Sequence, residues 1–221
     1  IDERLAALLE QRVHHAQLEL SAYDDGSTDD SYAMLVAWAP TFRDNGWAVV
    51  LGRSSAATGG GCGFAKNHAV EQSTGQWLCF QDVDDRMLDG RIATQLALAR
   101  ARPGFLVGAR VRRVPENSTA RYIEWANQIT ERQLLLHRFR ECTLLMPTWF
   151  MSRADFEAAG AFREEPCEDL LLLHSHVIRG GGLVRAGEAP LGADPAHARP
   201  ATRSRPRQPT LRRRVRVLLR H

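Results

Sequence analysis

Short apolar segments alternate with helical segments along the first half of the chain, and this alternation constrains the fold more than any other feature. The segments with strand character are 18–23, 47–51, 77–81 and 105–114. The helical segments between them are 32–39, stopping at Pro40, 64–72 and 91–101. A chain that alternates in this way forms a mainly parallel sheet with helices on its faces. In such sheets ligands bind at the carboxyl ends of the strands.

Acidic residues follow two of these strands directly. Asp24 and Asp25 come after the first strand, and Asp82 and Asp84 come after the third. Because carboxyl ends of parallel strands share one edge of the sheet, we expect both acidic clusters at the same edge. Asp82-Val83-Asp84 offers the oxygen ligands that Mg²⁺ or Mn²⁺ prefers. Each cluster taken alone is more typical of an acidic turn or of a helix start than of a binding site.

Two further short motifs carry groups with possible chemistry. Lys66, the only lysine of the chain, and Asn67 follow the Gly-rich stretch 59–63 at the start of a helix. A cation and a helix N-terminus together can hold a diphosphate, although a surface lysine is the plain alternative. Glu168 and Asp169 open a predicted helix over 168–179. A carboxylate there can act as a general base, or it can simply favour the helix dipole.

The second half of the chain is less regular. Thr130 with Gln133 forms a capping box that predicts a helix to about residue 139. Ser152 predicts another helix start, Gly160 its end, and 183–185 a short strand. Trp149 is either a sugar-stacking residue or a buried aromatic residue of the core.

Composition excludes several classes of protein. Hydrophobic residues make up 44% and charged residues 25% of the 221 residues, which excludes a disordered chain or a coiled coil. Residues 199–221 hold nine of the 29 basic residues and no acidic residue, which leaves 20 basic against 26 acidic residues before them. An acidic body and a tail without aromatic residues argue against nucleic-acid binding, although nine arginines could contact phosphates.

Regular patterning ends near residue 187. We therefore expect one domain over 1–187 and an Arg/Pro-rich tail over 188–221 without stable structure. No signal peptide or apolar membrane-spanning run is visible, so the default location is cytoplasmic.

Taken in order, the motifs resemble one family. They are DDGSTD at 24–29, GFAKNHA at 63–69, TGQWLCFQDVDD at 74–85 and EDL at 168–170. Over about residues 1–187 the chain resembles the inverting glycosyltransferases of family 2. The resemblance implies a GT-A fold, a three-layer α/β/α nucleotide-diphospho-sugar transferase with a mainly parallel central sheet. It also implies that the family's first, central strand is missing from this sequence, and that the tail departs from the family pattern.

The resemblance implies roles for the acidic and basic residues on the donor side. Asp24 and Asp25 match the pair that contacts the uracil and ribose of a UDP-sugar. Lys66, with Asn67 beside it, matches the basic residue near the diphosphate. Asp82 and Asp84 match the Asp-x-Asp motif that binds Mn²⁺ or Mg²⁺ and the donor, and Asp84 is expected to be the better metal contact.

Asp169 matches the catalytic base, with Glu168 next to it. The implied reaction moves a sugar, N-acetylglucosamine by analogy, from a UDP-sugar to an acceptor hydroxyl with inversion. The alternative is a catalytically inactive sugar-nucleotide-binding fragment, or a splice variant of such an enzyme.

Overall fold

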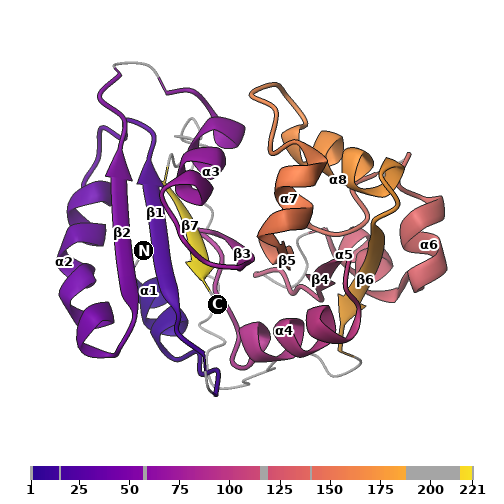
Figure 1. The fold of residues 1–221 in the computed structure, drawn as a ribbon, viewed down its shortest axis with the longest axis horizontal. Helices are drawn as coiled ribbons and strands as arrows, with labels where there is room; N and C mark the ends of the chain where they lie inside the picture. The colour runs from indigo at the N-terminus through magenta and orange to yellow at the C-terminus, as the bar shows by residue number, and fades with distance from the viewer. Residues whose placement is uncertain are drawn as a thin grey trace.

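Helices and strands alternate along the chain largely as predicted, and they form an α/β fold (Figure 1). The computed structural model describes residues 2–14, 16–56, 59–114, 119–139, 141–187 and 215–220. The elements are α1 (Asp2–Leu9), β1 (Glu19–Asp24), α2 (Ser31–Asp44), β2 (Ala48–Arg53), α3 (Cys62–Glu71), β3 (Trp77–Asp82), α4 (Arg91–Ala101), β4 (Phe105–Ala109), α5 (Ala120–Gln128), α6 (Glu131–Leu136), the 3-10 turn η1 (Met146–Thr148), β5 (Phe150–Ser152), α7 (Arg153–Ala159), α8 (Glu168–Ile178), β6 (Gly182–Ala186) and β7 (Val215–Arg220). No helix in these described ranges has the length and apolar character needed to cross a membrane.

All seven strands belong to one sheet, in the order β2-β1-β7-β3-β5-β4-β6. β1 is parallel to β2, and β4 is parallel to β6. β7 runs antiparallel to β1 and β3 on either side of it, so those two strands share one direction. β5 likewise runs antiparallel to β3 and β4. Five of these strands therefore point in one direction, as predicted, whereas β5 and β7 run the opposite way and make four of the six neighbouring pairs antiparallel.

The helices cover both faces of the sheet, and each face has its own hydrophobic core. Residues of α1, α2 and α4, such as Leu5, Phe42 and Ile92, form one core with the sheet. Residues of α3, α6, α7 and α8 form the other, which also holds Trp149 and Phe156. The structure thus confirms the predicted three layers.

The tail contains a strand that sequence patterning did not predict. We expected no stable structure after residue 187 beyond a terminal helical turn at the apolar patch 215–219, but Val215–Arg220 is a strand that pairs with β1 and β3 near the middle of the sheet. Residues 188–214 lie outside the described residues. A strand between β1 and β3 satisfies main-chain groups that would otherwise be buried without partners. The expectation was wrong for 215–220 because the apolar patch is short, and its strand conformation depends on pairing with residues far away in the sequence.

Helix α2 continues through Pro40, where we predicted its end. Proline in a helix interior removes one hydrogen bond and costs about 3 kcal/mol. The carbonyl that loses its donor belongs to Val36, which is 48% exposed and so lies on the solvent side. Beyond the proline, Phe42 is completely buried and packs edge-to-face on Trp47. Burial of this aromatic side chain holds the last turn of the helix in place.

Several predicted boundaries shift for reasons that the structure makes plain. β4 ends at Ala109 rather than near residue 114, because the amide and carbonyl of Val111 bond to the side chain of Asn127. The capping box of Thr130 is confirmed, although its helix ends at Leu136. α5 and β5 were not predicted.

A buried network around Arg91 joins β3, α4 and η1. The Arg91 guanidinium donates to the side-chain oxygens of Gln81 (2.7 Å) and Gln95 (2.9 Å), and to the main-chain oxygens of Phe80 and Pro147 (both 2.9 Å). The Gln95 amide donates in turn to main-chain oxygens of β4 and η1. The side chains of the network are at most 5% exposed, so each polar group depends on its partners here.

The central position of β7 predicts slow amide hydrogen exchange in its residues. Amides of 215–220 are expected to exchange as slowly as those of β1, because β7 is paired on both sides. Hydrogen exchange measured by mass spectrometry, with peptides that cover each strand, checks this. Exchange of the 215–220 peptide at the rate of an unstructured peptide would contradict the pairing.

Arg91→Met is expected to lower the free energy of unfolding by about 3 kcal/mol or more, because each buried acceptor left without a donor costs about 1–3 kcal/mol. Urea denaturation followed by circular dichroism measures this. Arg100→Met is the matched control, since Arg100 lies on the exposed side of the same helix. An equal effect of the two substitutions would show that the network does not stabilise the fold.

Candidate functional site

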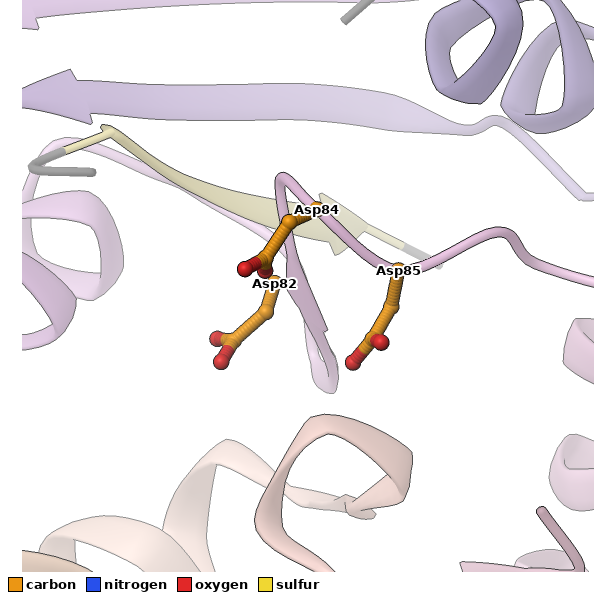
Figure 2. A group of neighbouring side chains, drawn as sticks. All are labelled: Asp82, Asp84 and Asp85. Atoms are coloured by element: carbon orange, nitrogen blue, oxygen red, sulfur yellow. The ribbon is translucent and has the colours of Figure 1, made fainter. Parts of the chain in front are cut away.

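Three carboxylates lie together in the turn that follows β3. One oxygen each of Asp82, Asp84 and Asp85 lies within 4.8 Å of the others. Figure 2 shows the three side chains leaving the turn on the same side. The structure therefore brings together Asp82 and Asp84, the two predicted metal ligands, and it adds Asp85. The signal for Asp85 was its position next to Asp84 in the sequence.

The electrostatics of this turn, residues 82–85 and called the acidic turn below, favour a cation. Partial desolvation, followed by the charges of Asp82 and Asp84, raises the pKa of Asp85, although the residue as a whole is exposed. Arg113 and Arg91 offset part of this effect. A divalent cation would relieve the repulsion among the carboxylates. An oxygen-only donor set also suits Mg²⁺ or Mn²⁺, so the residues present fit the predicted metal.

Residues that sequence analysis did not single out hold the acidic turn in shape. The side-chain amide of Gln81 donates to the main-chain oxygens of Asp82 (3.0 Å) and Asp85 (2.9 Å). Gln81 is itself fixed by Arg91. From the N-terminal helix, Arg4 Nε donates to the main-chain oxygen of Asp84 (3.2 Å). No local pattern marks these residues, because their contacts appear only when α1, β3 and α4 pack together.

Asp24 lies at the same edge of the sheet as the acidic turn. Its Cα is paired with that of Val215, and Asp82 is paired with the adjacent Arg216. The carboxyl ends of β1 and β3 are thus level, with one strand between them. This confirms the shared edge, although the two strands are not direct neighbours.

Asp24 and Asp25 both make contacts within the chain. Asp24 is completely buried; it accepts from the amide of Ser27 (2.9 Å) and pairs with Arg53 (3.0 Å). Asp25 accepts from the amides of Gly60 (3.0 Å) and Gly61 (2.9 Å), which belong to the loop before α3. Asp24 therefore shapes the turn after β1, and Asp25 holds the Gly-rich loop against it.

Lys66 and Glu168 form an ion pair. Lys66 Nζ lies 2.8 Å from Glu168 Oε1, and the lysine side chain is only 4% exposed. Asn67, the next residue on α3, bonds to the main chain of Phe162. The predicted donor-binding motif of α3 therefore contacts the segment that leads into α8.

Asp169 stands in the first turn of α8, where it accepts from the amide of Leu170 (2.7 Å). Among the described residues it forms no ion pair. Burial raises the pKa of the Cys142 thiol, and the negative charge of Asp169 adds to this effect.

Trp149 is a core residue. Its side chain is completely buried, donates to the main-chain oxygen of Leu144 and stacks on Phe162. The structure thus decides for the buried aromatic residue and against direct stacking on a sugar.

Comparison with known proteins agrees with this geometry. The crystal structure of S. aureus TarS superimposes with a TM-score of 0.64 at 17% identity, over 86% of this chain and 33% of that chain. A crystal structure of S. aureus TarS 1-349 gives a TM-score of 0.60 at 17% identity, over 86% and 54% of the two chains. The chain thus spans about a third to a half of these proteins, and the likeness shows a fold of the GT-A type. The profile of glycosyl transferase family 2 matches residues 1–159, and the chain therefore belongs to glycosyl transferase family 2.

Proposed function

We propose that the chain is a metal-assisted, inverting glycosyltransferase that moves a sugar from a UDP-sugar to an acceptor hydroxyl. The observation that carries this proposal is the cluster of Asp82, Asp84 and Asp85 at the carboxyl end of β3, inside the α/β sheet. Members of the family typically use a nucleotide-sugar donor and a divalent metal. Segments 116–129, 145–153 and 167–173 resemble a β-1,3-N-acetylglucosaminyltransferase-like protein, so UDP-N-acetylglucosamine is the first donor to test.

On the donor side, Asp82 and Asp84 would hold Mg²⁺ or Mn²⁺, with Asp85 as a further oxygen ligand. A bound divalent metal neutralises the charge of a departing diphosphate. Asp25 is proposed to contact the uracil or ribose, since a ribose hydroxyl could replace the amides of Gly60 and Gly61. Asp24 is fully buried, so its proposed role is to fix the turn that presents Asp25.

On the acceptor side, Asp169 is the proposed general base. Its carboxylate takes the proton of the acceptor hydroxyl, whose oxygen attacks the anomeric carbon of the sugar. The new bond forms on the face opposite to the bond that breaks, and the nucleoside diphosphate leaves. The position of Asp169 in the first turn of α8, next to the Lys66–Glu168 pair that contacts α3, supports this assignment.

Asp84→Asn is expected to weaken both metal-dependent donor binding and turnover, because a neutral amide is a poorer ligand for a hard cation. Calorimetric titration with UDP and Mg²⁺, together with an assay of UDP release from UDP-N-acetylglucosamine, measures the two effects. Asp89→Asn is the matched control, since Asp89 is exposed and follows five positions later in the same loop.

Unchanged metal dependence in Asp84→Asn would remove this residue as a ligand. Binding of UDP without any turnover of a UDP-sugar by the wild-type chain would favour the inactive sugar-nucleotide-binding alternative.

Asp169→Asn is expected to lower turnover by roughly 10²–10⁴-fold, because the shape is kept and the base is lost. Affinity for the UDP-sugar should stay close to that of the wild type, since Asp169 acts on the acceptor. Glu164→Gln, an exposed carboxylate shortly before α8, serves as the control. If Asp169 only favoured the helix start, the substitution would cost a few tenths of a kcal/mol in stability and leave turnover intact.

A further inference from the structure

The first turns of α3 dock closely against the segment that leads into α8. Lys66 Nζ lies 2.8 Å from Glu168 Oε1 and 4.9 Å from the ring centre of Phe162. The Lys66 side chain is 4% exposed and that of Glu168 is 18% exposed. A buried ammonium group is strongly unfavourable without a charged partner, so the two side chains depend on each other.

Two neighbours of Lys66 on α3 tighten the same contact. The side chain of Asn67 makes two hydrogen bonds to the main chain of Phe162. Asn67 Nδ2 donates to the Phe162 oxygen (2.8 Å), and Asn67 Oδ1 accepts from the Phe162 amide (3.0 Å). Gly63 faces the main-chain oxygen of Arg163, and a Cβ on Gly63 would lie 2.3 Å from that oxygen. Glycine is therefore required for the close approach, and the Gly-x-x-Lys-Asn sequence is shaped to fit this segment.

The docked segment holds residues in an unfavourable backbone conformation. Ala161 and Cys167 have φ angles of 59° and 66°, in the left-handed region that residues other than glycine rarely adopt. Cys167 immediately precedes α8. The direction in which Glu168 and Asp169 leave this point depends on the contacts that hold the strained segment. Phe162 packs on the core residues Phe80 and Trp149, and the polar contacts described above come from α3.

We propose that the Lys66–Glu168 ion pair is a positioning device that fixes the start of α8 and thereby the direction of the Asp169 carboxylate. Lys66 then holds the start of α8 through Glu168 and does not bind the diphosphate. Glu168 is the counter-ion of Lys66 and not a second base. The proposal rests on the proposed function, in which Asp169 is the base. Helix α3, which carries the predicted donor-binding motif, and helix α8, which carries the proposed base, are thus joined by one ion pair.

The ion pair can be tested without activity, because Lys66 is the only lysine of the chain. In protein labelled with [15N]lysine, one Nζ signal reports on this ammonium group. We expect Glu168→Gln to shift or broaden the signal, and UDP with Mg²⁺ to leave it unchanged. An Nζ signal that is unchanged by Glu168→Gln, or that shifts on addition of UDP, would overturn the proposal.

Kinetics separate a positioning role from a direct one. Glu168→Gln is expected to lower kcat for sugar transfer by about tenfold, the kind of loss caused by a displaced catalytic group, with KM for the UDP-sugar nearly unchanged. Glu165→Gln, an exposed carboxylate three positions earlier, is the control and should not change either constant. A loss as large as that of Asp169→Asn would mean that Glu168 is itself the base.

Lys66 is tested by a pair of variants. Lys66→Met is expected to lower kcat, and Lys66→Arg, which keeps the charge, is expected to recover much of the loss. A raised donor KM with unchanged kcat in Lys66→Met would assign Lys66 to the diphosphate instead. Absence of transfer by the wild-type chain would overturn the proposed function, whereas the Nζ signal decides on the ion pair independently.

Discussion

The acidic turn owes its shape to one buried cation, the guanidinium group of Arg91. Its donors reach β3, η1 and, through Gln95, the middle of β4, so three neighbouring elements share one hydrogen-bonded centre. Through Gln81 the same group fixes the main chain of Asp82 and Asp85. A rigid support of this kind lets three carboxylates stay close together in spite of their mutual repulsion.

The two halves of the candidate site are held by a second set of buried charges and amides. On one side the acidic turn sits on the Arg91 network, and on the other Asp169 stands at the start of α8. Lys66 and Asn67 connect the donor-side helix α3 to the segment before α8. The GT-A framework thus brings together residues that are 102 positions apart in the sequence, as the Lys66–Glu168 pair shows.

Local patterns in the sequence were sufficient for features that depend on neighbouring residues. The capping box of Thr130 and the cap of Ser152 follow from hydrogen bonds over three positions, and the shared edge of Asp24 and Asp82 follows from strand direction. Contacts between distant residues leave no such pattern. Gln81, Arg91 and the Lys66–Glu168 pair became visible only in the folded chain, as did the strand at 215–220.

The position of β7 has a consequence for synthesis on the ribosome. The chain is made from the N-terminus, so β1, β2 and β3 leave the exit tunnel long before residues 215–220. Until that segment arrives, β1 and β3 lack the strand that joins them, and pairing strands so far apart in the sequence is a slow, non-local step. During this interval the nascent domain presents unpaired strand edges, and such edges are prone to aggregate until the last strand closes the sheet.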